Sequence, residues 1–365
     1  MNKRTRIIGI AVAVAASIII LTSPSNSVII PPPTSSSNGT DAVQIVATHL
    51  QKPWAMSFGD NKIFFTEKVG RIRVIDNGTL VNDSIADLRV ADVTDAGLLG
   101  ITLHPDFEKN HFIYVYYTYQ EGNNLWNKVL RITESNDKMV DSKVIIDKIP
   151  GAEFDDGGVI KFGPDGKLYI GTGDATDQNS TQDLKSLAGK ILRLNDDGSI
   201  PQDNPFPNSP VYSYGHRNPQ GLTWDDKGNL YETEEGPTRN DEINLIKPGQ
   251  NYGWPIQECS GSPQYQSALD CFNPSIGPAG IVYYSSGKLD IKPSLILAAL
   301  IGQGLYQLPP AQNGTIFGQK IILDGIGRIR DVEQGPDGYL YILTSNTDGL
   351  GYPDQNDDKL LRIVK

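Results

Sequence analysis

A pair of strand-like segments recurs six times along the chain, and this repeat restricts the possible folds more than any other feature of the sequence. The first segment of each pair is a turn followed by an aromatic-rich stretch, and the second is a short stretch of alternating character. The first segments lie at 59–67, 109–118, 163–174, 227–236, 294–304 and 335–345. The second segments lie at 71–75, 128–132, 190–194, 242–246, 304–308 and 359–363. Six pairs in the same order indicate one structural unit repeated six times.

The alternation within each segment indicates strands that bury one face, and the Pro-Asp-Gly and Lys-Gly-Asn turns favour tight reversals. No such unit buries its apolar face alone, so the six units are expected to close into a ring. We therefore predict an all-β fold, a six-bladed β-propeller of four-stranded antiparallel blades that forms a single domain over 42–365. The strand-like segment at 43–50 precedes the first pair. We expect it to complete the last blade and close the ring.

The first 41 residues have a different character from the repeats. A basic start is followed by an apolar run from Ile7 to Leu21, the pattern of a secretory signal. The run is shorter than the roughly 20 residues of a membrane span, but no clean cleavage site follows it. We predict that 1–27 is a signal peptide or an N-terminal membrane anchor and that 28–41 is a Pro/Ser-rich tether. The protein is then secreted, or anchored to the outer face of the cytoplasmic membrane.

Composition excludes several classes of function. The formal charge is −11, with 43 acidic and 32 basic residues, and no basic cluster after the first residues offers a face for nucleic acid. Four His and two Cys exclude a zinc ribbon or a multi-His metal centre. Because an exported chain enters an oxidising compartment, Cys259 and Cys271 are predicted to form a disulfide, with two free buried thiols as the alternative.

Propellers bind ligands at the mouth of the central channel, so unusual loop residues carry the functional prediction. Asp155 and Asp156 stand before a Gly-Gly step that opens the third blade's inner strand. They are candidates for a general base or a cation site, and the alternative is a solvated acidic turn. A shift of one residue would turn Asp156 inward instead of Asp155.

The segment 214–221 places Arg217, Asn218 and Gln220 between two glycines. These side chains are suited to holding a planar anionic ligand, and the alternative is a surface loop paired with nearby acids. The segment 234–237, which we expect to end the fourth blade's inner strand, contains a Gly-Pro step among carboxylates. Its carbonyls suit a hard cation such as Ca²⁺, and a plain loop is the alternative.

Two arginines open the sixth blade. Arg328 and Arg330 are spaced to project from one face of an extended segment. In a protein of charge −11, two arginines directed at the channel would form a local anion site. Pairing with neighbouring acids is the alternative.

Long motifs at these positions resemble the soluble quinoprotein sugar dehydrogenases, the glucose/sorbosone dehydrogenase family. The resemblance covers nearly the whole chain after the tether. It rests on GLLGITLHPDF (97–107), GGVIKFGPDGKLYIGTGDA (157–175), YGHRNPQGL (214–222), EEGPTRNDEINLIKPGQNYGWP (234–255) and GRIRDVEQGPDGYLYILT (327–344). It implies a six-bladed propeller that binds pyrroloquinoline quinone (PQQ) and Ca²⁺ over the channel. It also implies oxidation of the C1 hydroxyl of aldoses, with an external electron acceptor.

The resemblance assigns roles to individual residues. Arg217 would stabilise the oxyanion that develops at the quinone carbonyl, and Asn218 and Gln220 would contact the cofactor or the sugar. The backbone carbonyls of Gly236 and Pro237 would bind Ca²⁺, which would act as a Lewis acid.

The same resemblance implies that Arg328 and Arg330 pair with the carboxylates of PQQ. Glu235 stands where members of the family carry a Gln beside the cofactor. A carboxylate at this position would repel a trianionic cofactor unless it binds the metal or takes up a proton.

The chain departs from the family pattern at three further positions. Asp155 occupies the place of the family's His base, Val159 replaces an Arg, and Ile301 aligns with a Lys that faces the cofactor. An Asp accepts the C1 hydroxyl proton less readily than a His unless burial raises its pKa.

We therefore expect an exported quinoprotein oxidoreductase that converts aldoses to lactones with PQQ and Ca²⁺, with Asp155 as the base. The alternative is a catalytically inactive propeller that binds a glycan or a protein partner at the channel mouth. A Ca²⁺-dependent lactonase on the same fold is a further possibility.

Overall fold

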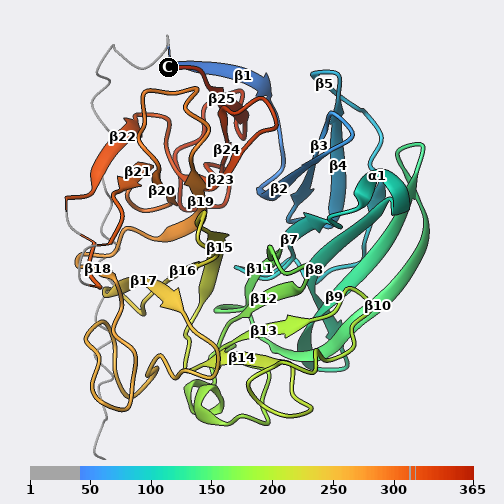
Figure 1. Cartoon of the computed structure of the whole chain (residues 1–365). Helices are drawn as coiled ribbons and strands as arrows, with labels where there is room; N and C mark the ends of the chain where they lie inside the picture. Colours follow the sequence, from blue (N-terminus) through green and yellow to red (C-terminus); the bar gives the residue numbers. More distant parts are fainter. Residues whose placement is uncertain (1–41, 312–313, 317) are drawn as a thin grey trace, which may run out of the picture. The chain divides into compact units, whose positions relative to one another are not determined.

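The strands of the computed structural model form six antiparallel sheets, each built from consecutive stretches of chain (Figure 1). The structure describes residues 42–365 except 312–313 and 317. The predicted signal or anchor at 1–27 and the tether at 28–41 lie outside the described residues. No helix in the described part is long and apolar enough to cross a membrane.

Blades one to three contain most of the long strands and both helical turns. Blade one consists of β2 (Pro53–Gly59), β3 (Lys62–Glu67), β4 (Arg71–Asp76) and β5 (Thr79–Leu80), with β6 (Ala86–Asp87) also paired to β4. Blade two consists of β7 (Leu98–Leu103), β8 (Phe112–Glu121), β9 (Asn124–Ser135) and β10 (Lys138–Gly151), with α1 (Phe107–Asn110) between β7 and β8. Blade three consists of β11 (Gly157–Phe162), β12 (Leu168–Thr172), β13 (Lys190–Leu194) and β14 (Val211–Tyr214), with η1 (Gln178–Gln182) between β12 and β13.

Blades four to six repeat the same meander. Blade four consists of β15 (Pro219–Trp224), β16 (Leu230–Glu234), β17 (Asp241–Ile246) and β18 (Asp270–Phe272). Blade five consists of β19 (Pro278–Tyr284), β20 (Ser294–Ala299), β21 (Gly304–Leu308) and β22 (Lys320–Asp324). Blade six consists of β23 (Ile329–Gln334), β24 (Leu340–Thr344), β25 (Leu360–Ile363) and β1 (Val43–Ala47).

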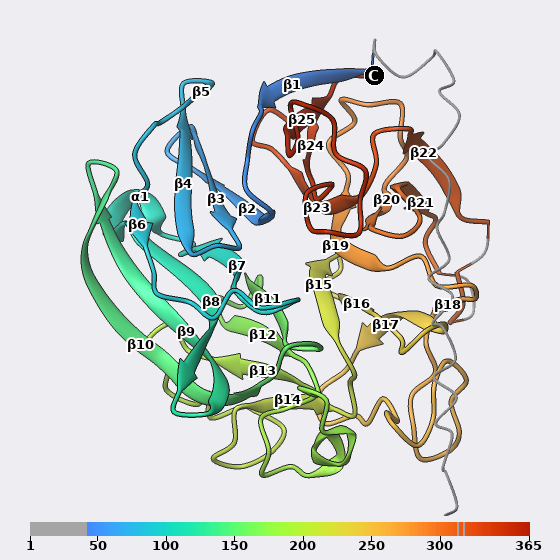
Figure 2. The same ribbon diagram turned by 180° about the vertical axis from the view of Figure 1, so that it is seen from behind.

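The first strand of each blade lies at the centre of a ring. Each of these inner strands packs against the inner strand of the next blade, and β2 meets β23 to complete the circle (Figures 1 and 2). The predicted six-bladed β-propeller is therefore confirmed. The two segments of the sequence repeat are the second and third strands of each blade, as β12 and β13 illustrate.

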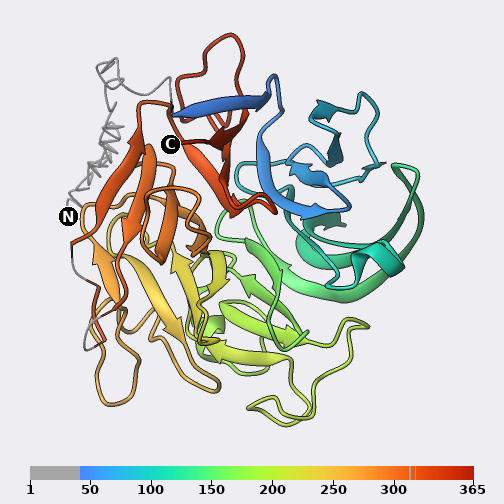
Figure 3. The same ribbon diagram turned by 45° about the horizontal axis from the view of Figure 1, so that its top comes forward.

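The ring closes by pairing its first strand with its last. β1 runs antiparallel to β25, with Val43 opposite Ile363 and Ala47 opposite Leu360. Figure 3 shows β1, in blue, beside the red C-terminal strands. Ala47 and Leu360 belong to an apolar cluster that joins blades six and one. The sequence prediction that the segment at 43–50 completes the last blade is confirmed.

One placement from the sequence was wrong. The segment 234–237 does not follow the fourth blade's inner strand, because Glu234 ends β16, the second strand. The inner strand is β15, which begins at Pro219 inside the preceding Arg-Asn-Pro motif. The correction leaves the segment on the same face of the ring, since antiparallel strands make the end of a second strand a neighbour of the start of an inner strand.

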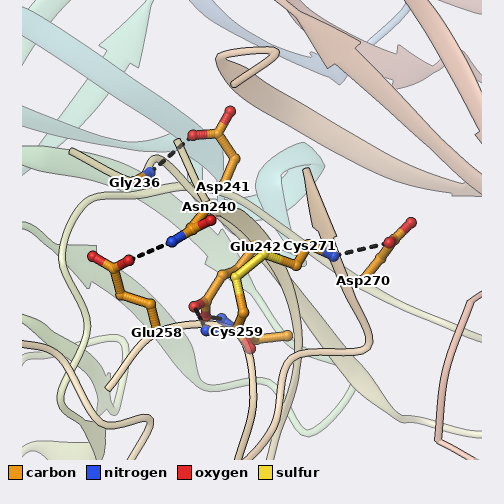
Figure 4. The surroundings of a disulfide bond; sticks show 9 residues. Gly236, Asn240, Asp241, Glu242, Glu258, Cys259, Asp270 and Cys271 are labelled. Atoms are coloured by element: carbon orange, nitrogen blue, oxygen red, sulfur yellow. Dashed lines mark hydrogen bonds between the residues drawn. A yellow bond between two sulfur atoms is a disulfide. The ribbon is translucent and has the colours of Figure 1, made fainter. Parts of the chain in front are cut away.

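The predicted disulfide is present in blade four. Cys259 and Cys271 are bonded through their sulfur atoms, with Cα atoms 5.7 Å apart, and the described residues contain no free cysteine. Cys271 lies in β18, and the backbone N–H of Cys259 donates to the carboxylate of Glu242 in β17 (Figure 4). The bridge therefore ties the long loop after β17 to the outer edge of its own blade, near the loop that carries Gly236.

Candidate active site

A cavity of about 480 Å³ opens at one end of the central channel. Its walls come from loops that precede inner strands and loops that follow second strands, which meet at the same face of the ring. The cavity contains the residues that the sequence singled out: Asp155, Asp156, Arg217, Asn218, Gln220, Glu235, Gly236, Pro237, Ile301, Arg328 and Arg330. Val159 instead lines a smaller cavity of about 240 Å³. This smaller cavity shares Trp54, Gln220 and Arg330 with the larger one.

An ion pair between Asp155 and Arg217 lies in the cavity wall. The Oδ2 atom of Asp155 accepts a hydrogen bond from Nη2 of Arg217 at 2.7 Å. Each side chain is 14% exposed, so the pair is held largely away from solvent. Nη1 of Arg217 donates to the backbone carbonyls of Glu235 at 2.9 Å and Gly236 at 3.0 Å. The guanidinium thus joins the loop before β11 to the loop after β16.

The backbone at Asp155 requires a glycine in the neighbouring loop after β12. Asp155 has a φ of 60°, a left-handed conformation that Asp and Asn tolerate better than most residues. Its carbonyl accepts a hydrogen bond from the backbone N–H of Ala175 at 2.9 Å. A Cβ atom on Gly173 would lie 1.7 Å from that carbonyl oxygen. Only glycine at this position allows the loop after β12 to support Asp155 so closely.

Asp156 has a structural environment quite unlike that of Asp155. It is 3% exposed, and its Oδ1 atom accepts hydrogen bonds from Asn127 Nδ2 at 2.8 Å and from the backbone N–H of Ala152 at 3.0 Å. These bonds hold the turn before β11 against β9. The Asp-Asp pair is thus divided into one carboxyl that pairs with an arginine of the cavity and one that supports the turn.

The surroundings of Asp155 raise the pKa of its carboxyl. Burial raises its pKa to about 6, against the influence of the Arg217 guanidinium, which lowers it. The neighbouring carboxyls of Asp174 and Asp95 also raise the pKa. At neutral pH the group is therefore mainly ionised and able to accept a proton, while being a stronger base than an exposed Asp.

Amide groups and a carboxyl line the passage into the channel. Asn218 Nδ2 donates to Glu235 Oε2 at 3.0 Å, and Gln220 Nε2 donates to Asn218 Oδ1 at 2.9 Å. Burial raises the pKa of Glu235 to about 7, which partly neutralises the carboxyl that the sequence placed beside the cofactor. The network fixes both amides in orientation.

The two predicted arginines have different partners. Arg328 is paired with Asp348, with 2.8 Å between Nε and Oδ2. Arg330 lies over the ring of Trp54 at 3.9 Å, and its buried Nε atom has no hydrogen-bond partner. Burial lowers the pKa of Arg330 to about 10, so it remains a cation at neutral pH. A cation in the wall of a cavity is suited to an anionic ligand.

The residues of the cavity fit PQQ better than they fit Ca²⁺, the two groups that the family resemblance implies. The positive charge of Arg330, in the wall of the cavity, fits the carboxylates of PQQ. The carbonyl of Gly236, expected to bind Ca²⁺, already accepts a hydrogen bond from Arg217. A cation at that carbonyl would compete with a guanidinium, so the calcium site does not fit this arrangement of side chains.

The cavity also contains residues that the sequence did not single out as site residues, among them Trp54, Lys68 and Asp95. Lys68 is 9% exposed, and its Nζ donates to the carbonyl of Thr94. Burial lowers the pKa of Lys68 and raises that of Asp95. A usable signal was present, because Lys68 directly follows the second strand of blade one as Glu235 follows that of blade four.

A buried cluster behind the cavity holds Arg217 in place. His216, Glu232 and Glu234 bring potential metal-ligating atoms within 4.8 Å of one another. His216 Nδ1 lies 2.9 Å from Glu234 Oε2, and the other oxygen of Glu234 accepts the backbone N–H of Arg217. The hydrogen bonds from Glu234 therefore fix the backbone at Arg217 and bring its side chain toward Asp155.

The sequence of the propeller matches a known protein family over most of its length. A family model described as glucose/sorbosone dehydrogenase matches residues 50–352. The chain belongs to the glucose/sorbosone dehydrogenase family. The matched residues include blades one to five, strands β23 and β24 of blade six, and all the site residues named above.

Individual members of the glucose/sorbosone dehydrogenase family are similar over most of the chain. The chain is 31% identical to the aldose sugar dehydrogenase YliI of Escherichia coli over 340 residues, which cover 84% of this chain and 91% of that protein. It is 35% identical to quinoprotein glucose dehydrogenase B of Acinetobacter calcoaceticus over 58% of this chain and 52% of that protein. The PQQ-bound structure of an aldose sugar dehydrogenase from Streptomyces coelicolor matches with a TM-score of 0.80 and 35% identity, covering 88% of this chain and 98% of that one.

Proposed function

We propose that this member of the family oxidises the C1 hydroxyl of aldoses to lactones with PQQ as cofactor and Asp155 as general base. The observation that carries the proposal is the buried Asp155–Arg217 pair in the same cavity as the cationic guanidinium of Arg330. The relatives named as aldose sugar dehydrogenases and quinoprotein glucose dehydrogenase support the same reaction class.

Each charged residue has a distinct part in the proposed reaction. Asp155 takes the proton of the C1 hydroxyl as the C1–H bond breaks. Arg217 holds Asp155 and uses three of its five N–H groups in the bonds described, which leaves two for an oxygen in the cavity. PQQ, when bound, supplies the acceptor for the hydride from C1. Arg330 binds a carboxylate of the cofactor.

Calcium is a separate part of the proposal. The carbonyls of Gly236 and Pro237 would serve as ligands only if Arg217 gave up its bond to Gly236. None of the steps assigned to Asp155, Arg217 and Arg330 depends on the metal. A PQQ affinity that depends on added Ca²⁺ would support the calcium site at Gly236 and Pro237. A PQQ affinity that is unchanged in the presence of a chelator would contradict it.

Location outside the cytoplasm is also proposed. The signal-like pattern of residues 1–27 supports it, and so does the Cys259–Cys271 bridge, since disulfides persist in oxidising compartments. Reduced PQQ would then pass its electrons to an external acceptor.

The test is a titration of the purified protein with PQQ in excess Ca²⁺, followed through the visible spectrum of the quinone, and then addition of an aldose. Saturable binding and sugar-dependent bleaching are expected. A folded protein that binds no PQQ at about 50 µM would contradict the proposal, because that limit corresponds to a binding free energy weaker than about −6 kcal/mol. The inactive binding propeller would then be favoured.

Replacing Arg330 by Met is expected to weaken PQQ binding by about 10–100-fold, the value of one hydrogen bond to a charged group. The melting temperature without cofactor is expected to stay constant or rise, because a buried cation with an unused donor is removed. Arg131→Met is the matched control, since Arg131 also lies over an aromatic ring, that of Phe112 at 4.0 Å, in the outer half of blade two. Loss of stability with unchanged PQQ affinity would show that Arg330 is structural.

A further inference from the structure

A further cavity of about 610 Å³, named the second cavity, lies on the same face of the ring. It adjoins the 480 Å³ cavity that contains Asp155, named the active cavity. It is formed by the turn between β8 and β9, the segment between β10 and β11, and the loop after β12. Phe154 and Thr176 line both cavities. The two spaces therefore adjoin at the residue that directly precedes Asp155.

The lining of this second cavity combines aromatic rings with short polar side chains. Phe154 is 47% exposed, and Trp126 is partly exposed in β9. The polar side chains include Asn124, Asp177 and Ser180. Aromatic rings contact the C–H groups of a sugar ring, while amides, hydroxyls and carboxylates pair with its hydroxyls. A cavity with an apolar surface and a few polar groups also orients its ligand.

We propose that the second cavity is a subsite for the second and later sugar units of an oligosaccharide whose reducing end occupies the active cavity. The inference rests on the proposed oxidation at C1. The reducing-end unit of a 1→4-linked sugar has its C1 hydroxyl at Asp155 and is joined at C4, across its ring, to the following unit, which occupies the adjoining cavity beyond Phe154. The preferred substrates are then reducing oligosaccharides rather than free monosaccharides.

Contacts to a remote sugar unit raise kcat/KM when they help to hold the reducing end in place for reaction. We expect kcat/KM for the best of cellotriose and maltotriose to exceed that for glucose by about 10-fold or more. Trp126→Ala is expected to bring this ratio down to about one. Asn124→Ala, a change at an exposed turn, is expected to reduce the ratio as well, and it guards against a Trp126 variant that fails to fold.

Tyr339→Ala is the matched control. Tyr339 is a half-buried aromatic residue with a cation over its ring, Arg362 at 4.1 Å, as Trp126 has Lys148 at 5.2 Å. It lies in the turn between β23 and β24, at the opposite face of the ring. The ratio of kcat/KM values should not change in this variant.

A second measurement tests binding of the oligosaccharide independently of its oxidation. Quenching of tryptophan fluorescence by cellotriose or maltotriose, lost in Trp126→Ala, would support the subsite even if no aldose were oxidised. In that case the proposed function fails and the subsite stands. Oxidation of glucose with a ratio near one, unchanged by Trp126→Ala and without quenching, would overturn the subsite and leave the proposed function intact.

Discussion

Asp155→Asn is expected to lower kcat for aldose oxidation by roughly 10²–10⁴-fold, the usual contribution of a general base. PQQ should still bind, because Arg330 and Arg328 are untouched. Asn tolerates the left-handed φ of 60° at this position and keeps an oxygen that accepts the bond from Arg217. The substitution therefore removes the proton acceptor with little change of shape. Single-turnover bleaching of the bound quinone by sugar measures the effect.

The pH profile gives an independent check on the same residue. The base acts when ionised, and burial raises its pKa to about 6. In the wild type, kcat/KM should therefore rise with pH below about 6, tenfold per unit at the acid limit, and level off above it. In Asp155→Asn this acid limb should vanish. A limb that persists in the variant would assign it to another group and contradict the role of Asp155.

Asp156→Asn separates the two adjacent carboxyls. Asp156 accepts hydrogen bonds from Asn127 and from the backbone of Ala152 on Oδ1, an oxygen that Asn keeps, so the substitution should change the melting temperature little and leave kcat near that of the wild type. A loss of kcat in Asp156→Asn as large as that in Asp155→Asn would mean that the base has been assigned to the wrong member of the pair.

Deleting Val43–Ala47 from the full chain is expected to cost about 5 kcal/mol or more in the free energy of unfolding. The deletion removes the ladder between β1 and β25, at about 1 kcal/mol per hydrogen bond. It also uncovers the apolar cluster that joins blades six and one, at roughly 1.5–3 kcal/mol per large side chain. The melting temperature should fall by roughly 10 °C. Calorimetry measures both quantities.

An equally long deletion, of residues 35–39 in the predicted tether, is the control and should leave the melting temperature unchanged. Similar losses from both deletions would contradict the role of β1 in closing the ring. A chain lacking β1 should also associate more readily, because the edge of β25 is then free to pair with another strand.

The sequence predicted the inner half of the fold better than its outer half. β12 and β13 are buried at every position, on both faces and not on one as the alternation predicted, and their apolar residues mark them as strands in the sequence. β10, an outermost strand, is mostly exposed and contains three register shifts, so no periodic apolar pattern marks it. Solvent contact relaxes the pattern from which strands are predicted.

For the site, the sequence indicated which loops meet but not how their charges pair. Arg328 and Arg330 look alike in the sequence, yet one is bonded to Asp348 and the other has an unused donor. Lys68 follows the second strand of its blade as Glu235 does, but its burial and its bond to the carbonyl of Thr94 depend on the folded structure. Such pairings depend on contacts between different blades, and local spacing contains no information about them.

The closure of the ring by β1 also governs when the protein can finish folding. The backbone N–H of Val364 donates to the carbonyl of Ala42 at 2.8 Å, so the beginning of the described chain bonds to its end. Synthesis proceeds from the N-terminus, and the sixth blade thus lacks its third strand until Leu360–Ile363 are made, long after β1. Long-range pairing of this kind slows folding. A chain that stops before Leu360 would retain five blades and an open ring.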